Sequence, residues 1–320
     1  MVPHGQETPP FKYSLAVERR ALQASKLHRQ IPNKSSRKML AATWNLTNFG
    51  VQQRLRKDIQ LIAEVIGWFD LIAIQEVADD LTDLRTLLRY LPNYKVILSD
   101  IGGNEERTGF LYDSKKIQRL ELAAEVAVPP SDHRYIRMRG ASGSFKGFDR
   151  NPYAVAFKAG RLEFIAVSVH LYFGSHSYFD EDRRALEAYA LARWADRRKK
   201  TPESYSNNVL LLGDFNLPSM EEKGNVYKAL ASKGLILPKY STQLMGSNLK
   251  GDMHYDQVAF HAGRMKNYFT GNSGVFDFDR APFFGKAWDN RLSKEENHYF
   301  RQAIKFHISD HRPLWSEFSI

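Results

Sequence analysis

The run Val209–Leu212, which Gly213 closes, is followed at once by Asp214 and Asn216. Four large apolar residues in a row predict a strand that is covered on both faces of a sheet, because a strand with one wet face alternates in polarity. The two polar residues then stand at the C-terminal end of a buried strand, where open α/β sheets commonly bind ligands. Asp and Asn are also ordinary turn formers, so this motif alone does not decide between a turn and a site.

Similar apolar periodicity recurs along the chain and predicts alternating strands and helices. Two halves of this kind, with hairpins between them, predict two packed mixed sheets flanked by helices rather than one parallel sheet. The expected strands are residues 39–44, 70–74, 94–98, 108–112, 154–158, 162–170, 209–213, 255–260, 265–269 and 312–318. The expected helices are residues 13–30, 52–68, 81–91, 180–200 and 220–231, the last of them capped by Ser219. The polar stretches 131–151, 171–180, 240–253 and 271–298 are expected to be loops that carry contacts to substrate.

Composition limits the class of protein. A chain of 320 residues, 43% of them hydrophobic, can bury a large core. The absence of cysteine excludes disulfides, zinc-thiolate sites and cysteine nucleophiles. Since no apolar run approaches the about 18–20 residues of a membrane span, and the first residues lack a basic-then-apolar signal pattern, a cytoplasmic location is expected. The net charge of +10 favours polyanionic partners, nucleic acid first and anionic membrane surfaces second.

Residues 1–38 are expected to form a basic leader that precedes a main domain of residues 39–320. Between Phe11 and Lys38 there are eight Lys or Arg residues and a single acid, Glu18. One interpretation is an arm for nucleic acid or membrane. The interpretation that we favour is a helix packed on the domain or a loose leader.

Acid, amide and histidine side chains adjoin several other expected strands. One polar residue at a strand end is an ordinary turn, but five or six of them with metal-ligand or acid–base side chains favour a functional site. The residues concerned are Asn45, Glu76, His170, Asp256 and the pair Asp310-His311.

These motifs, in this order, resemble those of the endonuclease/exonuclease/phosphatase superfamily, to which deoxyribonuclease I and exonuclease III belong. The resemblance implies a four-layer α/β sandwich of two mixed sheets, with one cleft that hydrolyses phosphate esters with the help of Mg²⁺. Residues 39–320 would form its catalytic domain. The matching pieces are Trp44-Asn45, Gln75-Glu76, the strand that ends at His170, Gly213 to Asn216, Tyr255 to Val258 and Ser309 to His311.

The resemblance also implies a metal site. In it Glu76, Asn45 and Asp310 would hold or orient the divalent ion. Mg²⁺ takes few protein oxygens and keeps several waters, so one or two carboxylates and a substrate phosphate are enough. The ion would polarise the phosphoryl oxygen and neutralise charge in the transition state, and Mn²⁺ or Ca²⁺ are possible substitutes.

Asp214 and Asn216 are two positions apart, so they point the same way if the extended geometry continues through the turn. Asp214 could align the attacking water or accept its proton, and Asn216 could hold a phosphate oxygen. The two histidines, His170 and His311, could donate to the phosphoryl oxygens or to the leaving group. In the family, the aspartate that matches Asp256 is the partner of the last histidine.

The segment around Glu106 resembles the deoxyribonuclease I branch, in which the matching glutamate pairs with the histidine at position 170 here. Arg150, in Arg150-Asn151-Pro152, matches an arginine that grips a phosphate, and Arg107 is a further candidate for binding substrate. Where deoxyribonuclease I has an arginine for the minor groove, this chain has Asp79-Asp80 after Ala78. That departure argues against duplex binding by this surface.

The favoured function is a Mg²⁺-dependent phosphodiesterase that acts on nucleic acid, most of all a DNA endonuclease. The same catalytic set on RNA, or a phosphatase or phospholipase acting on phosphoinositides or sphingomyelin, is the alternative within the family. A catalytically dead nucleic-acid-binding module is disfavoured, because degenerate copies typically lose a metal carboxylate or a histidine and all of these are present. No obligate protein partner is indicated, and the oligomeric state, strand preference and choice between internal and terminal cleavage stay open.

Overall fold

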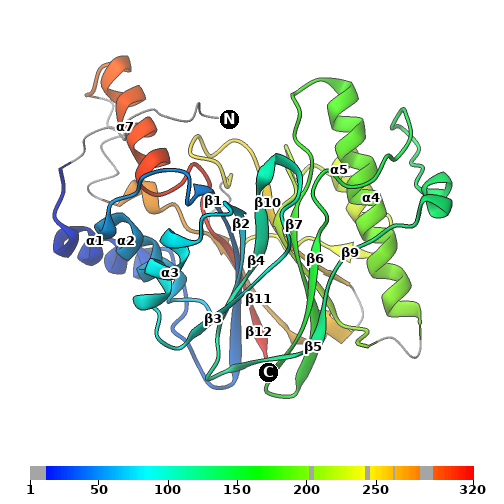
Figure 1. Ribbon diagram of the computed structural model, residues 1–320, viewed down its shortest axis with the longest axis horizontal. Helices are drawn as coiled ribbons and strands as arrows, with labels where there is room; N and C mark the ends of the chain where they lie inside the picture. The colour runs from blue at the N-terminus through cyan, green and yellow to red at the C-terminus, as the bar shows by residue number, and fades with distance from the viewer. Residues whose placement is uncertain (1–11, 202–204, 242–245, 262–263, 282–290) are drawn as a thin grey trace.

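Two mixed six-stranded sheets lie against each other, with helices on both outer sides (Figure 1). The computed structural model describes residues 12–201, 205–241, 246–261, 264–281 and 291–320. Apolar side chains of both sheets fill the space between them, and a further apolar layer lies under the helices on each side. This is the expected four-layer sandwich, so the predicted fold is confirmed.

The first sheet has the strand order β11-β12-β1-β2-β4-β3, and the second has β5-β6-β7-β8-β10-β9. The strands of the first sheet are β1 (Lys38–Phe49), β2 (Leu71–Val77), β3 (Tyr94–Leu98), β4 (Arg107–Asp113), β11 (Phe269–Val275) and β12 (Leu314–Ser319). The strands of the second sheet are β5 (Ile117–Glu125), β6 (Tyr153–Ala159), β7 (Leu162–His170), β8 (Val209–Asp214), β9 (Leu235–Ile236) and β10 (Asp256–His261).

The helices divide between the two outer faces (Figure 1). On the side of the first sheet lie α1 (Leu15–His28), α2 (Arg56–Ile66), α3 (Thr82–Arg89) and α7 (Lys294–His307). On the side of the second sheet lie α4 (Tyr178–Lys200) and α5 (Asn225–Ala231), and the short α6 (Arg264–Tyr268) precedes β11. None of the described helices combines the length and the apolar character that a membrane crossing requires.

Several of the local expectations differ from the structure. Residues 265–269 were expected to form a strand, but most of them belong to α6, and β11 starts only at Phe269. The helix expected over 220–231 is confined to α5, and Gly224 rather than Ser219 precedes it. Strands β5 and β9 and helix α7 were not expected. In α7 the buried residues are confined to its C-terminal half, so its first turns show no apolar face.

Helix α1 packs on the domain. Its Ala21 and Leu22 are buried in the apolar layer under the helices, and Arg19 and Gln23 both contact Glu64 of α2. Just after the helix, Arg29 donates two hydrogen bonds of 2.6 Å to the carboxylate of Asp277. Arg19 and Arg29 of the leader therefore form ion pairs within the molecule, which favours the packed-helix interpretation. Residues 1–11 lie outside the described residues, and the boundary at residue 38 stays a prediction.

Candidate active site

The register of the sheets brings distant residues to one edge of the sandwich. β7 and β8 are parallel, with His170 opposite Asp214, and β10 is antiparallel to β8, with Asp256 also opposite Asp214. In the other sheet β1 and β2 are parallel, which sets Asn45 opposite Gln75 and therefore beside Glu76. Parallel strands end at the same edge, so the polar residues that follow them converge.

Asp214 lies at the centre of this arrangement and is nearly fully buried. Its Oδ2 atom is 3.7 Å from Nε2 of His170 and 3.8 Å from Nε2 of His311. The side-chain amide of Asn45 donates to the same oxygen at 3.2 Å. The backbone N–H of Asn216 donates to Oδ1 at 2.8 Å. One carboxylate oxygen is thus faced by both imidazoles.

His311 is held from behind by Asp256. Its Nδ1 atom is 2.8 Å from Oδ2 of Asp256, whose side chain has no exposed surface. Burial alone would lower the pKa of His311, but Asp256 and then Asp214 outweigh burial and raise that pKa well above its usual value. These carboxylates therefore favour the charged form of the ring, whose Nδ1 is bound by Asp256 and whose Nε2 faces Asp214.

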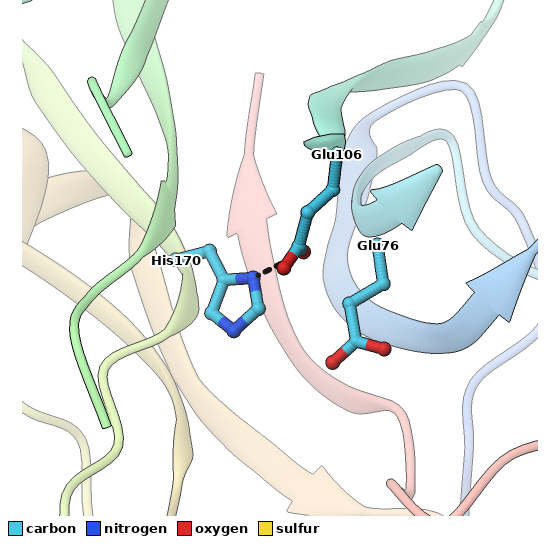
Figure 2. A group of neighbouring side chains, drawn as sticks. All are labelled: Glu76, Glu106 and His170. Atoms are coloured by element: carbon cyan, nitrogen blue, oxygen red, sulfur yellow. Dashed lines mark ion pairs between the residues drawn. The ribbon is translucent and has the colours of Figure 1, made fainter. Parts of the chain in front are cut away.

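His170 is paired with Glu106, which precedes β4 (Figure 2). The distance between Nδ1 and Oε2 is 3.0 Å. Arg150 Nη1 donates to the other oxygen of Glu106 at 3.1 Å. Burial would raise the pKa of Glu106, but His170 and Arg150 outweigh it and the pKa is lowered. The carboxylate form of Glu106 is therefore favoured, and His170 and Arg150 both contact it.

Arg150 was predicted to grip a phosphate. In the structure it is buried, and besides Glu106 it donates to the backbone oxygens of His170 at 3.1 Å and Leu171 at 2.9 Å. All three guanidinium nitrogens are thus engaged by protein atoms. This geometry makes Arg150 a brace of the His170–Glu106 pair, and its contact with phosphate stays a prediction.

Glu76 provides the carboxylate next to that pair. Its backbone has a φ of 58°, in the left-handed region that residues other than glycine rarely adopt. Its two oxygens accept hydrogen bonds from the Asn45 amide at 2.8 Å and the Asn48 backbone at 2.9 Å. Figure 2 shows Glu76, Glu106 and His170 pointing toward a common space, and their ligand atoms lie within 4.8 Å of one another.

These residues fit a hard divalent ion. Carboxylate oxygens are the ligands that Mg²⁺ prefers, and Glu76 borders a hollow of about 190 Å³ with room for an ion and its waters. Asn45 directs its amide group at Glu76, while its oxygen accepts from the backbone of Thr47 at 3.0 Å. Asn45 therefore orients Glu76 in this structure, and ligation of an ion by Asn45 stays a prediction. The hollow is lined by Thr47, Asn48, Glu76, Asn104, Glu106, Lys305, Asp310 and His311.

Lys305 is a residue of the site that the sequence reasoning missed. Its Nζ atom lies 2.5 Å from Oδ2 of Asp310, while the hydroxyl of Thr47 donates to Oδ1. Burial would raise the pKa of Asp310, but His311 and Lys305 lower it to about 2. Lys305 belongs to α7, a helix that was not expected from the sequence. Its position five residues before the Asp310-His311 pair was the available signal.

Two predicted substrate-binding residues have other partners. Arg107 donates to Asp79 and to the Ser99 backbone, at 2.8 Å each, beside a smaller hollow of about 80 Å³ that Glu106 and His170 also line. The amide of Asn216 donates to the Leu171 backbone oxygen at 2.8 Å. The structure therefore brings both residues to the edge of the site, and their contact with substrate stays a prediction.

Comparisons with known proteins agree with this fold. No protein-family model matches the chain. A curated protein named "Deoxyribonuclease" from Thioalkalivibrio sp. (strain K90mix) is 24% identical over 299 residues, which are 89% of this chain and 72% of that protein.

Among solved structures, the mannosyl-6-phosphatase Bt3783 of Bacteroides thetaiotaomicron superposes with a TM-score of 0.57 at 19% identity, over 88% of this chain and 100% of that one. An endonuclease/exonuclease/phosphatase family protein from the same species has a TM-score of 0.55 at 19% identity, over 88% of this chain and 97% of that one. D. rerio TDP2 complexed with a single-strand DNA product has a TM-score of 0.55 at 12% identity, over 88% of this chain and 99% of that one. The resemblance that the sequence motifs indicated is confirmed at the level of the fold.

Proposed function

We propose that this chain, which has the fold of the endonuclease/exonuclease/phosphatase proteins, is a metal-dependent phosphodiesterase that cleaves nucleic acid, most of all a DNA endonuclease. Its net charge of +10 suits a polyanionic substrate. The curated relative named "Deoxyribonuclease" and the neighbour bound to a single-strand DNA product support nucleic acid as that substrate.

The observation that carries the proposal is the position of Asp214 between two imidazoles, at 3.7 and 3.8 Å. Hydrolysis of a phosphodiester needs a group that aligns water and a group that protonates the leaving oxygen. Asp214 is the carboxylate and His311 the cation, and Asp256 sets the tautomer of that imidazole. A purely structural cluster has no need for two histidines that share one carboxylate oxygen.

The roles follow from the charges of the groups. A divalent ion bound next to Glu76 would supply charge neutralisation at the phosphoryl oxygens. Asp214 aligns the attacking water and accepts its proton as the new P–O bond forms. His311 gives the proton of its Nε2 to the oxygen that leaves as the old P–O bond breaks. His170, braced by Glu106 and Arg150, donates to a non-bridging oxygen.

A phosphomonoesterase is the second candidate. The mannosyl-6-phosphatase with the same fold is the observation that favours it. The catalytic groups would be unchanged, and the leaving oxygen would belong to a sugar or other small alcohol. The two candidates differ in whether a nucleic-acid strand or a soluble monoester is hydrolysed.

The decisive experiment is cleavage of supercoiled plasmid with Mg²⁺, with EDTA, and by the variants Asp214→Ala and His311→Ala. We expect nicked circles that require Mg²⁺ and disappear in both variants. Glu221→Ala, which removes an exposed carboxylate that pairs with the exposed Lys223, is the control and should nick like the wild type. An intact plasmid with folded wild-type protein would refute the DNA endonuclease, and hydrolysis of a soluble monoester instead would establish the second candidate.

A further inference from the structure

Lys305 stands among acids at the mouth of the site. The hollow beside Glu76 is lined by three carboxylates, those of Glu76, Glu106 and Asp310. A phosphate ester brings further negative charge into this space, and like charges at such distances repel strongly in a partly buried site. Lys305 supplies a positive charge from within the chain, and its side chain is still 28% exposed.

The ammonium group is held in place by Asp310 and by the packing of its helix. Asp310 binds it at 2.5 Å, and Asp310 itself is held by the hydroxyl of Thr47. The end of α7 that carries Lys305 is anchored by the buried residues Ile304 and Phe306. His307, next in the helix, bonds Asp58 of α2 at 2.8 Å, and both side chains are buried. Lys305 is therefore a positioned cation rather than a free surface lysine.

Asp310 is placed differently from the other acids. Two groups of acids and histidines among the described residues could each hold an ion, Glu76 with Glu106 and His170, and Asp214 with Asp256 and His311. Asp310 belongs to neither group, although the sequence analysis expected it to help hold the metal. Each of its oxygens already has a partner, and the partner of one is the lysine ammonium.

We propose that Lys305 is a phosphate-binding residue of this site. Its ammonium, held by Asp310, donates to a non-bridging oxygen of the phosphoryl group, while the divalent ion is held on the side of Glu76. The lysine thereby takes the place of a second cation next to Asp310. The inference rests on the proposed function in one respect, that a phosphate ester is the ligand.

The test is the direct binding of inorganic phosphate, measured by isothermal titration calorimetry with and without Mg²⁺. We expect Lys305→Met to weaken phosphate binding at least about tenfold, as the loss of one charged hydrogen bond would. Lys305→Arg should retain most of the affinity. Lys294→Met makes the same change at an exposed position of the same helix and should bind like the wild type.

Binding does not require turnover, so it decides the role of Lys305 even if no nuclease activity is found. Equal affinity of Lys305→Met and wild type for phosphate, or no binding by the wild type in either condition, would overturn the proposal. Lys305→Gln serves if the Met variant does not fold, as judged by circular dichroism. Where the protein is active, the KM for a short DNA substrate should rise more than kcat falls.

The count of metal ions gives an independent readout. We expect the wild type and Asp310→Asn to bind the same number of Mn²⁺ ions per chain in an electron paramagnetic resonance titration, because the lysine occupies the side of Asp310. A count that falls by one ion in Asp310→Asn, with phosphate affinity insensitive to Lys305, would show that Asp310 is a metal ligand and Lys305 only its structural neighbour.

Discussion

The two halves of the site use the same pair of residue types in different surroundings. In the half around β10, His311 bonds the fully buried Asp256 at 2.8 Å. In the half around β4 and β7, His170 pairs at 3.0 Å with Glu106, whose side chain is 13% exposed and also bonds Arg150. A buried carboxylate that pairs with one imidazole has a strong electrostatic interaction with it. A carboxylate that also binds a guanidinium interacts less strongly with each of its two partners.

The comparison teaches that a histidine–carboxylate pair does not define a role by itself. The charges of Asp256 and Asp214 raise the pKa of His311, which suits a proton donor. Arg150 ties Glu106 to the backbone at the end of β7, which suits a group that must be held in position. In the proposed mechanism, the same two residue types therefore serve proton transfer in one half and placement in the other.

Asp214→Ala should have the largest effect, because both halves face this one carboxylate. Removal of an aligned general base typically costs about 10²- to 10⁴-fold, and we expect a loss of kcat near the upper end. Single-turnover cleavage of plasmid in Mg²⁺ measures it. A loss below about tenfold would mean that the two imidazoles do not act through Asp214.

Asp256→Asn and Glu106→Gln compare the two halves directly. We expect Asp256→Asn to lower kcat/KM by about 10²-fold and Glu106→Gln by about tenfold, because only the first removes the charge that keeps a proton donor charged. Steady-state cleavage of one oligonucleotide by both variants measures the difference. Equal losses would show that the two pairs share one role.

The dependence of activity on pH should also distinguish the two histidine–carboxylate pairs. In the proposed mechanism the protonated form of His311 is the donor, and a raised pKa keeps it protonated as pH rises. The limb on which activity is lost at high pH should therefore fall above the usual histidine range. Asp256→Asn should move that limb to lower pH, since the first charge that raises the pKa is gone. Glu106→Gln should leave the limb in place. Profiles of kcat/KM between about pH 5 and 10 measure both shifts.

Arg150→Met should have the smallest effect on chemistry and a clear effect on stability. It removes the donor that Arg150 supplies to the backbone oxygen of His170, at a cost of about 1–3 kcal/mol for an unsatisfied buried group, whereas the Leu171 oxygen keeps the Asn216 amide as a donor. We expect unfolding in urea at lower concentration and a loss of kcat/KM below about tenfold, since Arg150 acts through placement. A large loss of kcat/KM with unchanged stability would show that Arg150 contacts the phosphate.

Much of the architecture followed from local patterns. The buried run that ends at Asp214 and the strand that ends at His170 were predicted within a residue of their observed ends. The periods of apolar residues in strands and helices are short, so a window of ten residues contains them. Where the pattern was weak, as in α6 and α7, the prediction failed or was missing.

The amino-acid sequence by itself determined the two-sheet sandwich and the set of acids, amides and histidines that adjoin its strands. Through its resemblance to a known family, it also predicted that Glu106 and Asp256 are the partners of the two histidines. Only the tertiary structure decided that both imidazoles face one oxygen of Asp214, that Arg150 braces a pair, and that Lys305 lies against Asp310. The physical reason is range: apolar periods are local, whereas these contacts depend on strand register and helix packing between distant residues.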